Sequence, residues 1–250
     1  MKKEITFTIL FNNVHFADTI KTSWGMSCYI EGSEKNILFD TGGDFKILLH
    51  NMEKLHVDPC SVDILAFSHI HADHTAGIEE ILKINPDLTV FLLSSFPQNF
   101  KTSVLKSDAK MTEVIEPVAL CKNVWSTGEM GESIKEQALI VNTRQGIVIV
   151  TGCAHPGIVH VVKKAHKLRP DKIYLVLGGF HLKASSEDKV KKIIKKLKQL
   201  GVINIGPSHC TGETPMQLFR EAWGKNFLDL GAGAILKIEH WEEGLVISDR

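Results

Sequence analysis

The segment SHIHADHTAG (68–77) places three histidines and one aspartate within six residues. An apolar, strand-like run, VDILAFSH (62–69), leads directly into it. Imidazole and carboxylate groups are costly to bury unless they are paired or bind a metal. They are also the usual ligands of zinc, iron and manganese. Because a catalytic metal usually takes three protein ligands and keeps a position open, the fold must bring further ligands to this segment.

The spacing within the segment predicts two ligand positions. His69 and His71 are two residues apart at the end of the strand, and in extended backbone such side chains face the same way. We therefore expect these two imidazoles to converge on one ion. Asp73 and His74 follow where we expect the chain to turn into a helix that begins near Thr75. Their side chains are expected to face a second position nearby.

Two later segments also place a histidine directly after an apolar strand. GCAHPG (152–157) contains His155, and PSHCTG (207–212) contains His209. Ligands at several strand ends meet at one edge of a sheet, where the site of an α/β protein is expected. These two histidines are therefore candidate ligands for the same site.

The expected elements follow the same order in both halves of the chain, with strands first and alternating helices and strands after. In the first half we expect strands at 5–11, 24–31, 35–40, 62–69 and 88–95 and helices at 44–55 and 74–84. In the second half we expect a hairpin at 136–152, helices at 157–167, 187–200 and 214–223, and strands at 172–178, 202–206 and 233–239. The segment 112–128 is expected as an edge strand, because Pro117 cannot donate a ladder hydrogen bond. The predicted fold class is α/β (α+β), with two similar halves packed sheet to sheet and helices outside.

Charge and cysteine content argue against several classes of protein. The 29 Lys and Arg residues balance 29 Asp and Glu residues, so nothing in the overall charge favours nucleic acid or an acidic membrane surface. The five cysteines include no CxxC pair, which argues against a disulfide framework. No apolar run reaches the roughly 18 residues of a membrane span. We expect a cytoplasmic protein that acts on a small-molecule substrate, either as a monomer or as a homodimer.

HIHADH resembles the HxHxDH signature of the metallo-β-lactamase superfamily, and most of the chain follows the motif order of that family. ILFDTGG (37–43) is similar to the first motif, TGCAHPG (151–157) to the third and SHCTG (208–212) to the last. The resemblance implies one domain over 1–250, folded as a four-layer αββα sandwich with its site at one sheet edge. The residues that it implies at the site are His69, His71 and His155 around one metal, Asp73, His74 and His209 around a second, and Asp40 as the buried aspartate that supports the metal loop.

One feature of the superfamily is missing from this chain. The family usually supplies a bridging aspartate from a strand end between the third and last motifs. The matching segment here, YLVLGGFHL (174–182), has Gly178, Gly179 and Phe180 at that place, followed by His181. The second metal is then weak, absent or bridged by water alone. We expect one or two divalent metal ions per chain, zinc in the first place, with iron and manganese as alternatives.

The combination of GCAHPG, GGFHL and SHCTG is similar to the dihydropteroate-synthase-like branch of the superfamily. The resemblance implies a hydrolase that uses a metal-activated water on a small ester, amide or phosphate-type substrate. Asp73 would orient or deprotonate that water if the second metal is missing. His181 has three alternative roles besides that of a histidine at a helix start: metal ligand, general acid and substrate contact. Trp24 and Phe180 are expected to line the substrate pocket.

The cysteines next to two candidate ligands have two interpretations. Cys153 lies two residues before His155, and Cys210 directly follows His209. Each is either a thiol beside the metal, where it would be acidified, or a small buried packing residue.

Four other functions remain as alternatives. The first is a pterin-condensing transferase, in which an arylamine replaces water as the nucleophile and diphosphate leaves. A nuclease is disfavoured by the neutral charge, and an oxygen-reducing di-iron protein is disfavoured by the missing bridging carboxylate. The last alternative is a non-enzymatic metal-binding protein.

Overall fold

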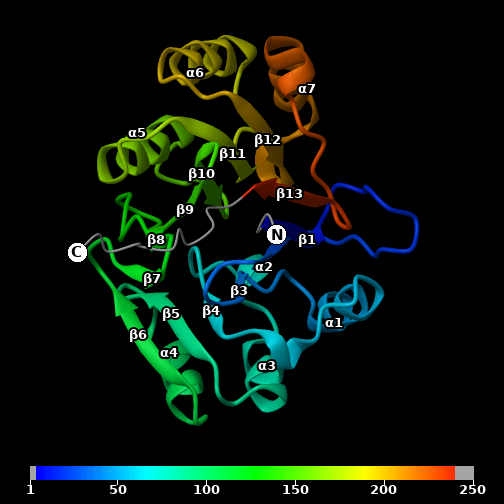
Figure 1. Ribbon diagram of the computed structural model, residues 1–250, viewed down its shortest axis with the longest axis vertical. Helices are drawn as coiled ribbons and strands as arrows, with labels where there is room; N and C mark the ends of the chain where they lie inside the picture. The colour runs from blue at the N-terminus through cyan, green and yellow to red at the C-terminus, as the bar shows by residue number, and fades with distance from the viewer. Residues whose placement is uncertain (1–3, 240–250) are drawn as a thin grey trace, which may run out of the picture.

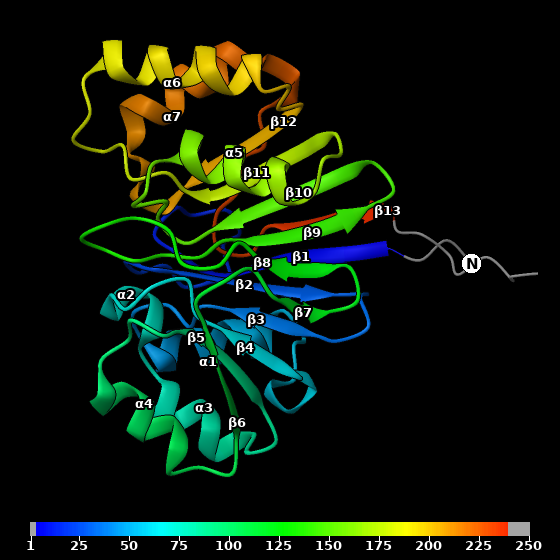
Figure 2. The same ribbon diagram turned by 90° about the vertical axis from the view of Figure 1, so that its left-hand side faces the viewer.

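The computed structural model describes residues 4–239, in which two β-sheets pack face to face and helices cover both outer faces (Figure 1, Figure 2). In order across the first sheet, its seven strands are β13 (Ile235–Glu239), β1 (Glu4–Asn12), β2 (Met26–Glu31), β3 (Ile37–Phe39), β4 (Ile64–Ala66), β5 (Thr89–Leu93) and β6 (Lys110–Val114). In order across the second sheet, its six strands are β12 (Asn204–Ser208), β11 (Ile173–Gly179), β10 (Gly146–Thr151), β9 (Leu139–Thr143), β8 (Val124–Ser126) and β7 (Ala119–Cys121).

Helices cover the two sheets separately. The first sheet is covered by α1 (Phe45–Lys54), α3 (Ile78–Ile84) and α4 (Gln98–Leu105), and the second by α5 (Ile158–Leu168), α6 (Glu187–Gln199) and α7 (Glu213–Trp223) (Figure 2). A short helix, α2 (Ala72–Thr75), lies at the edge where the two sheets meet. Three single 3-10 turns complete the described elements: η1 (Pro59–Ser61), η2 (His209–Thr211) and η3 (Gly224–Asn226). This arrangement confirms the predicted αββα sandwich.

The two sheets are built on the same plan. In each, consecutive antiparallel strands are followed by parallel ones: β3 to β6 in the first sheet and β10 to β12 in the second. Parallel strands in a sheet end at the same edge. The loops that follow β3, β4, β10, β11 and β12 can therefore meet, and these loops carry the residues that the sequence analysis singled out.

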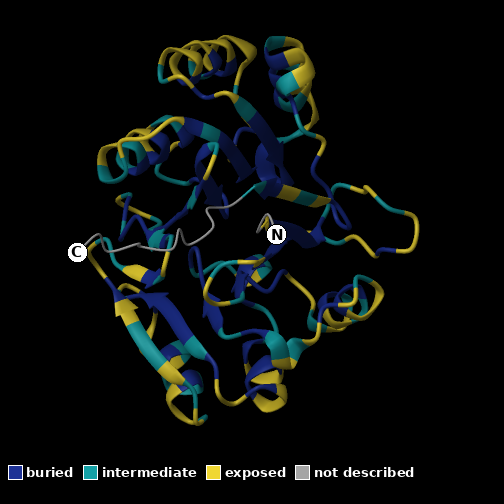
Figure 3. Ribbon diagram, viewed as in Figure 1, coloured by how far each residue is buried: buried dark blue, intermediate teal, exposed yellow. Residues whose placement is uncertain are grey.

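Alternating residues of the central strands are buried on both faces of the second sheet. In β10, Val148 and Val150 belong to the core between the sheets, whereas Ile147 and Ile149 pack toward the helices. All four side chains are fully buried, and Figure 3 shows the same for most of both sheets. Strands covered on both faces are expected to be continuously apolar, as GIVIVT is. This rigid double layer holds the loops at the sheet edge in place.

Side-chain hydrogen bonds cap the start of two helices. The Asp44 side chain accepts hydrogen bonds from the backbone N–H groups of Lys46 and Ile47 at the start of α1. The Ser186 side chain accepts one from the N–H of Lys189 at the start of α6. Among residues 4–239, none of the helices combines the length and the apolar character that crossing a membrane would need.

One expected helix is two helices in the structure. The segment 74–84 was expected to be continuous, but α2 already begins at Ala72 and the chain breaks before α3 begins at Ile78. Gly77 at the break has a positive φ of 82°, and an added Cβ would lie 2.6 Å from the Cβ of Phe45. The break therefore needs a glycine, and it leaves His74 inside a separate single-turn helix.

The strand expected at 112–128 is wrong, whereas the one expected at 233–239 is confirmed but joins the other sheet. The segment 112–128 is not one edge strand: β6 ends the first sheet, and after Pro117 the chain crosses over to form β7 and β8 of the second sheet. The last expected strand, 233–239, belongs to the first sheet and not to the second. It pairs with β1 in antiparallel register, with Ile5 opposite Ile238.

Candidate metal centre

Three predicted ligands meet on the side of the site nearest β10. His69 Nε2 lies 3.1 Å from His71 Nδ1. The ring of His155 lies 4.8 Å from the ring of His69 and 4.9 Å from that of His71, measured between centroids. His69 and His71 come from the loop after β4, and His155 comes from the loop after β10. The fold thus brings together the three residues expected at the first metal position.

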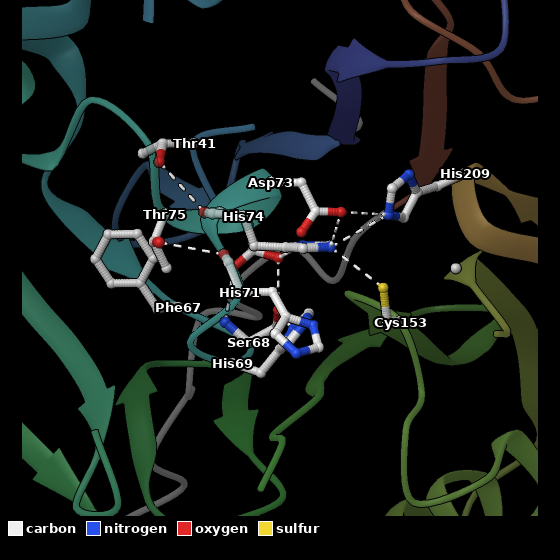
Figure 4. Close-up of polar contacts among 12 residues, drawn as sticks. Thr41, Phe67, Ser68, His69, His71, Asp73, His74, Thr75, Cys153 and His209 are labelled. Carbon is white, nitrogen blue, oxygen red and sulfur yellow. Dashed lines mark hydrogen bonds and ion pairs between the residues drawn. The ribbon is translucent and has the colours of Figure 1, made fainter. Parts of the chain in front are cut away.

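The other three predicted ligands meet beside them. His74 Nε2 lies 3.2 Å from His209 Nε2, and Asp73 Oδ2 lies 3.6 Å and 3.3 Å from these two nitrogens (Figure 4). Burial opposes ionisation of Asp73, but the neighbouring His209 and His74 rings lower its pKa to about 2. Asp73 is therefore a carboxylate at neutral pH, as a metal ligand must be.

Asp40 sets the orientation of one ligand in each group. Its fully buried carboxylate accepts hydrogen bonds from the Ser68 backbone N–H (2.7 Å), the Ser68 hydroxyl (2.6 Å) and His74 Nδ1–H (2.7 Å). Since the single Ser68 hydroxyl proton points at Asp40, the Ser68 oxygen accepts from His69 Nδ1–H at 2.9 Å. In neutral imidazoles both Nε2 atoms then carry lone pairs that face the site.

Asn13 orients His209 in the same way. The Asn13 side-chain NH2 donates to the His209 carbonyl oxygen at 3.2 Å, so its amide oxygen faces the ring and accepts from His209 Nδ1–H at 2.7 Å. His209 Nε2 is consequently an acceptor. His74 Nε2 lies 3.2 Å from His209 Nε2. Burial opposes protonation of His74, but the Asp40 carboxylate raises its pKa, so the place between the two rings favours a cation. Two imidazole nitrogens beside the Asp73 carboxylate are a donor set that fits a metal ion.

The group of His69, His71 and His155 also fits a metal ion. His155 Nε2 is buried and has no hydrogen-bond partner. Burial, followed by the neighbouring histidines, lowers the pKa of His69 and brings that of His155 to about 4, so both rings are neutral at pH 7. Neutral imidazoles with free lone pairs are the form that binds a divalent metal. The residues present therefore fit a metal ion at both groups.

Two consecutive residues that the sequence analysis did not single out hold the two loops together. The buried Glu136 carboxylate accepts backbone N–H groups from Cys153, Ala154 and His155, each at 2.8 Å. Desolvation raises the pKa of Glu136 to about 7. Gln137 bonds the other loop: its backbone N–H donates to the Ser68 carbonyl and its side-chain NH2 to the Phe67 carbonyl. Nothing in the sequence pattern marks these two residues, because their role depends on loops that meet only in the folded chain.

Two thiols and His181 lie next to the ligands. Cys153 Sγ is 3.2 Å from His74 Nε2, as the dashed line in Figure 4 shows. Cys210 Sγ accepts the His181 backbone N–H at 3.3 Å. Hydrogen bonds from the Cys153 thiol and from His181 lower the pKa of Cys210. The bond between the two thiols raises the pKa of Cys153. The hydrogen bond to Cys210 also raises the pKa of His181, whose ring lies 4.3 Å from that of His155.

The two expected pocket aromatics occupy different places. The side chain of Trp24 is 45% exposed, its ring lies 4.9 Å from that of His209, and the Lys183 ammonium lies 5.1 Å above it. Trp24 is thus an accessible wall beside the second group. Phe180 is only 1% exposed and packs with its ring 5.5 Å from that of Phe219, in the core under the helices. The expectation that Phe180 lines the pocket is corrected, because the chain turns its side chain inward at the end of β11.

Comparisons with known proteins identify relatives of this chain. The family model of the metallo-beta-lactamase superfamily matches residues 25–90. The chain is 32% identical over 262 residues to 7,8-dihydropterin-6-methyl-4-(beta-D-ribofuranosyl)-aminobenzene-5'-phosphate synthase of Methanocaldococcus jannaschii, covering 85% of this chain and 89% of that protein. An uncharacterized protein of the same organism is 29% identical over 222 residues, covering 75% of this chain and 84% of that protein.

Solved structures show the same fold. A metal-dependent hydrolase of the beta-lactamase superfamily superposes with a TM-score of 0.81 at 26% identity, covering 94% of this chain and 99% of that one. The short form of human tRNase Z superposes with a TM-score of 0.64 at 10% identity, covering 93% and 99%. At that identity the second likeness concerns the fold alone.

Proposed function

We propose that this chain, which belongs to the metallo-β-lactamase superfamily and its dihydropteroate-synthase-like branch, is a metal-dependent hydrolase of a small ester, amide or phosphate-type substrate. The observation that carries the proposal is the convergence of imidazole nitrogens and a carboxylate from separate loops at one place. His74 Nε2 and His209 Nε2 face each other at 3.2 Å, and His155 Nε2 has no partner. Packing alone does not account for such an arrangement, because buried polar atoms are normally paired.

The proposed ligands are His69, His71 and His155 at one position and Asp73, His74 and His209 at the other, with zinc as the first candidate ion. A bound divalent metal would supply an acidified water and a charge that polarises the substrate. Neutral nitrogen and carboxylate donors suit zinc, and iron and manganese remain alternatives.

Asp73 and His181 have different roles in proton transfer. The Asp73 carboxylate, ionised at neutral pH, accepts and orients a water proton. His181 lies at the exposed rim against the His155 ring, and its hydrogen bond to Cys210 raises its pKa and so favours the protonated imidazole. A protonated His181 is placed to donate a proton to a leaving group or to bind an anionic group of the substrate.

A second candidate function is condensation of a pterin with an arylamine. The M. jannaschii relative is named as such a synthase. The exposed Trp24 ring beside His209, with the Lys183 ammonium above it, also offers an aromatic and cationic wall for a flat ring that carries phosphate. In that reaction an arylamine would take the place of water and diphosphate would leave.

One experiment tests both functions. The metal-loaded protein is incubated with a 7,8-dihydropterin-6-methyl diphosphate, with and without 4-(β-D-ribofuranosyl)aminobenzene 5'-phosphate, and diphosphate release is measured. A panel of small ester, amide and phosphate substrates is assayed in parallel, before and after chelation. Release that needs the arylamine would establish the condensation. Turnover of any panel substrate that chelation abolishes and zinc restores would support the hydrolase, and chelator-insensitive turnover would contradict both.

A further inference from the structure

The end of β11 has no room for a side chain between the two metal-facing groups. Gly178 has a φ of 115°, and a Cβ added there would lie 2.1 Å from the Thr151 carbonyl oxygen. A Cβ added at Gly179 would lie 2.3 Å from the Gly152 carbonyl oxygen and 2.8 Å from Cys210 Sγ. No carboxylate can therefore reach the site from this strand end, because backbone and a thiol already fill the space.

A thiol stands between the two groups instead. Cys153 Sγ shares one set of ligand atoms with His69 and His155 and another with His74 and His209, each set lying within 4.8 Å. Among residues 4–239, Cys153 is the residue that occurs in both of these sets. Its side chain is 3% exposed, and Sγ lies 3.2 Å from His74 Nε2.

Backbone hydrogen bonds hold the loop around Cys153, and with it the thiol, in this position. The Cys153 backbone N–H donates to the buried Glu136 carboxylate at 2.8 Å, as does that of its neighbour Ala154. Ala154 has a positive φ of 55°, which is uncommon for a residue other than glycine. Strained backbone that persists in a buried loop marks a place where the surrounding structure holds a functional geometry.

We propose that the Cys153 thiolate is a ligand shared by the two metal positions, in the place that a carboxylate from β11 cannot reach. The inference rests on the proposed metal-dependent function and adds a sulfur donor to both positions. On binding, the S–H bond breaks, the proton is released to solvent and a sulfur–metal bond forms, without any change of oxidation state. Cys210 is a positioning residue: it accepts the His181 N–H and lies 3.8 Å from the Cys153 carbonyl oxygen.

The shared thiolate also narrows the choice of metal. Thiolate is a soft ligand that suits zinc and iron, whereas manganese prefers oxygen donors. We therefore expect the protein to take up zinc or iron(II) in preference to manganese when the metals compete at equal concentration. Cys153→Asp, which replaces sulfur by oxygen, is expected to move that preference toward manganese.

Titration of the metal-free protein with cobalt(II) tests the assignment without an activity assay. We expect the wild type to bind cobalt at both groups, to show a near-ultraviolet thiolate-to-cobalt charge-transfer band and to release the thiol proton. Cys153→Ser should lose the band and bind the second cobalt at least about tenfold more weakly. Cys60→Ser, at an exposed cysteine away from the site, and Cys210→Ser should keep the band.

The remaining outcomes show whether this inference fails alone or together with the proposed function. Cobalt binding at both groups of the wild type without a charge-transfer band would overturn the shared thiolate and leave the metal-dependent function standing. No cobalt binding by the folded wild type would overturn both. A band that survives Cys153→Ser but disappears in Cys210→Ser would assign the sulfur ligand to Cys210 and overturn the proposal. X-ray absorption of the cobalt-loaded wild type checks for a sulfur neighbour directly, so the test does not depend on how well a variant folds.

Discussion

The two halves of the molecule bring residues to the site in different ways. The first half supplies His69, His71, Asp73 and His74 from one short segment after β4. The second half supplies its candidates from the ends of separate strands, with His155 after β10 and His209 after β12. The supports differ as well, because each half relies on a different buried carboxylate.

The difference shows how each half obtains its rigidity. Asp40 accepts three hydrogen bonds from Ser68 and His74, and so holds side chains directly. Glu136 accepts three from the backbone around Cys153 and holds the path of a loop. Side-chain support fixes which nitrogen of a histidine faces the metal. Backbone support fixes where the residue lies, but it does not fix which of its side-chain atoms faces the metal.

The largest effect is expected from Asp40→Ala. The change leaves the Ser68 hydroxyl and His74 Nδ1–H without their acceptor in a fully buried place. Each buried donor left without an acceptor costs about 1–3 kcal/mol. We expect this loss in the free energy of unfolding, measured in urea, together with loss of metal at both groups. A variant that still binds metal with wild-type stoichiometry would show that the first half does not depend on this carboxylate.

His181→Ala should lower activity without removing metal. The His181 ring lies at the rim and is bound to Cys210, so the proposed ligand groups stay complete without it. A general acid contributes roughly 10²–10⁴-fold to turnover, so kcat should fall by that factor on a substrate with a poor leaving group. A substrate that needs no proton on leaving serves as the matched control and should be affected much less. Loss of one metal in elemental analysis would instead make His181 a ligand.

Glu136→Gln should weaken chiefly the ligand group that contains His155. The Cys153 and Ala154 N–H groups share one carboxylate oxygen, which an amide oxygen can replace, whereas the His155 N–H would then face an NH2 group. An unsatisfied buried donor costs about 1–3 kcal/mol. We expect a loss of that size in the free energy of unfolding and weaker metal binding at the group that contains His155. Equal weakening of both groups would show that Glu136 does not act on the His155 loop alone.

Trp24→Ala should have the smallest effect, because Trp24 lies outside the ligand groups. Removing the exposed ring also removes the contact with Lys183, worth about 0.5–1 kcal/mol at an exposed site. We expect KM to rise roughly two- to fivefold, as the loss of one substrate contact of about 0.5–1 kcal/mol with the ring would give, while kcat and metal content stay unchanged. Trp24→Phe should recover most of the KM. A fall in kcat that exceeds the rise in KM would place Trp24 closer to the reacting atoms than proposed.

Much of this site could be predicted from the sequence because the ligands of its first half are contiguous in the chain. The motif HIHADH needs only the local geometry of a strand end and a helical turn to place two pairs of side chains. His155 and His209 were predicted from their places after apolar strands, and the structure brings both to the cluster. Phe180 shows the limit of such reasoning. Its position in the chain was beside the site, but the direction of its side chain depends on the turn after β11, which buries it against Phe219.

The sequence by itself determined the two-part strand and helix order, the dense ligand segment and the absence of a carboxylate at the end of β11. These follow from local periodicity and residue chemistry, which act over a few neighbouring residues. Only the tertiary structure decided that β13 joins the first sheet, that Glu136 and Gln137 hold the two loops, and that Cys153 lies between the two ligand groups. Those features depend on contacts between residues far apart in the chain, and burial between two sheets selects such contacts only when the whole sandwich has formed.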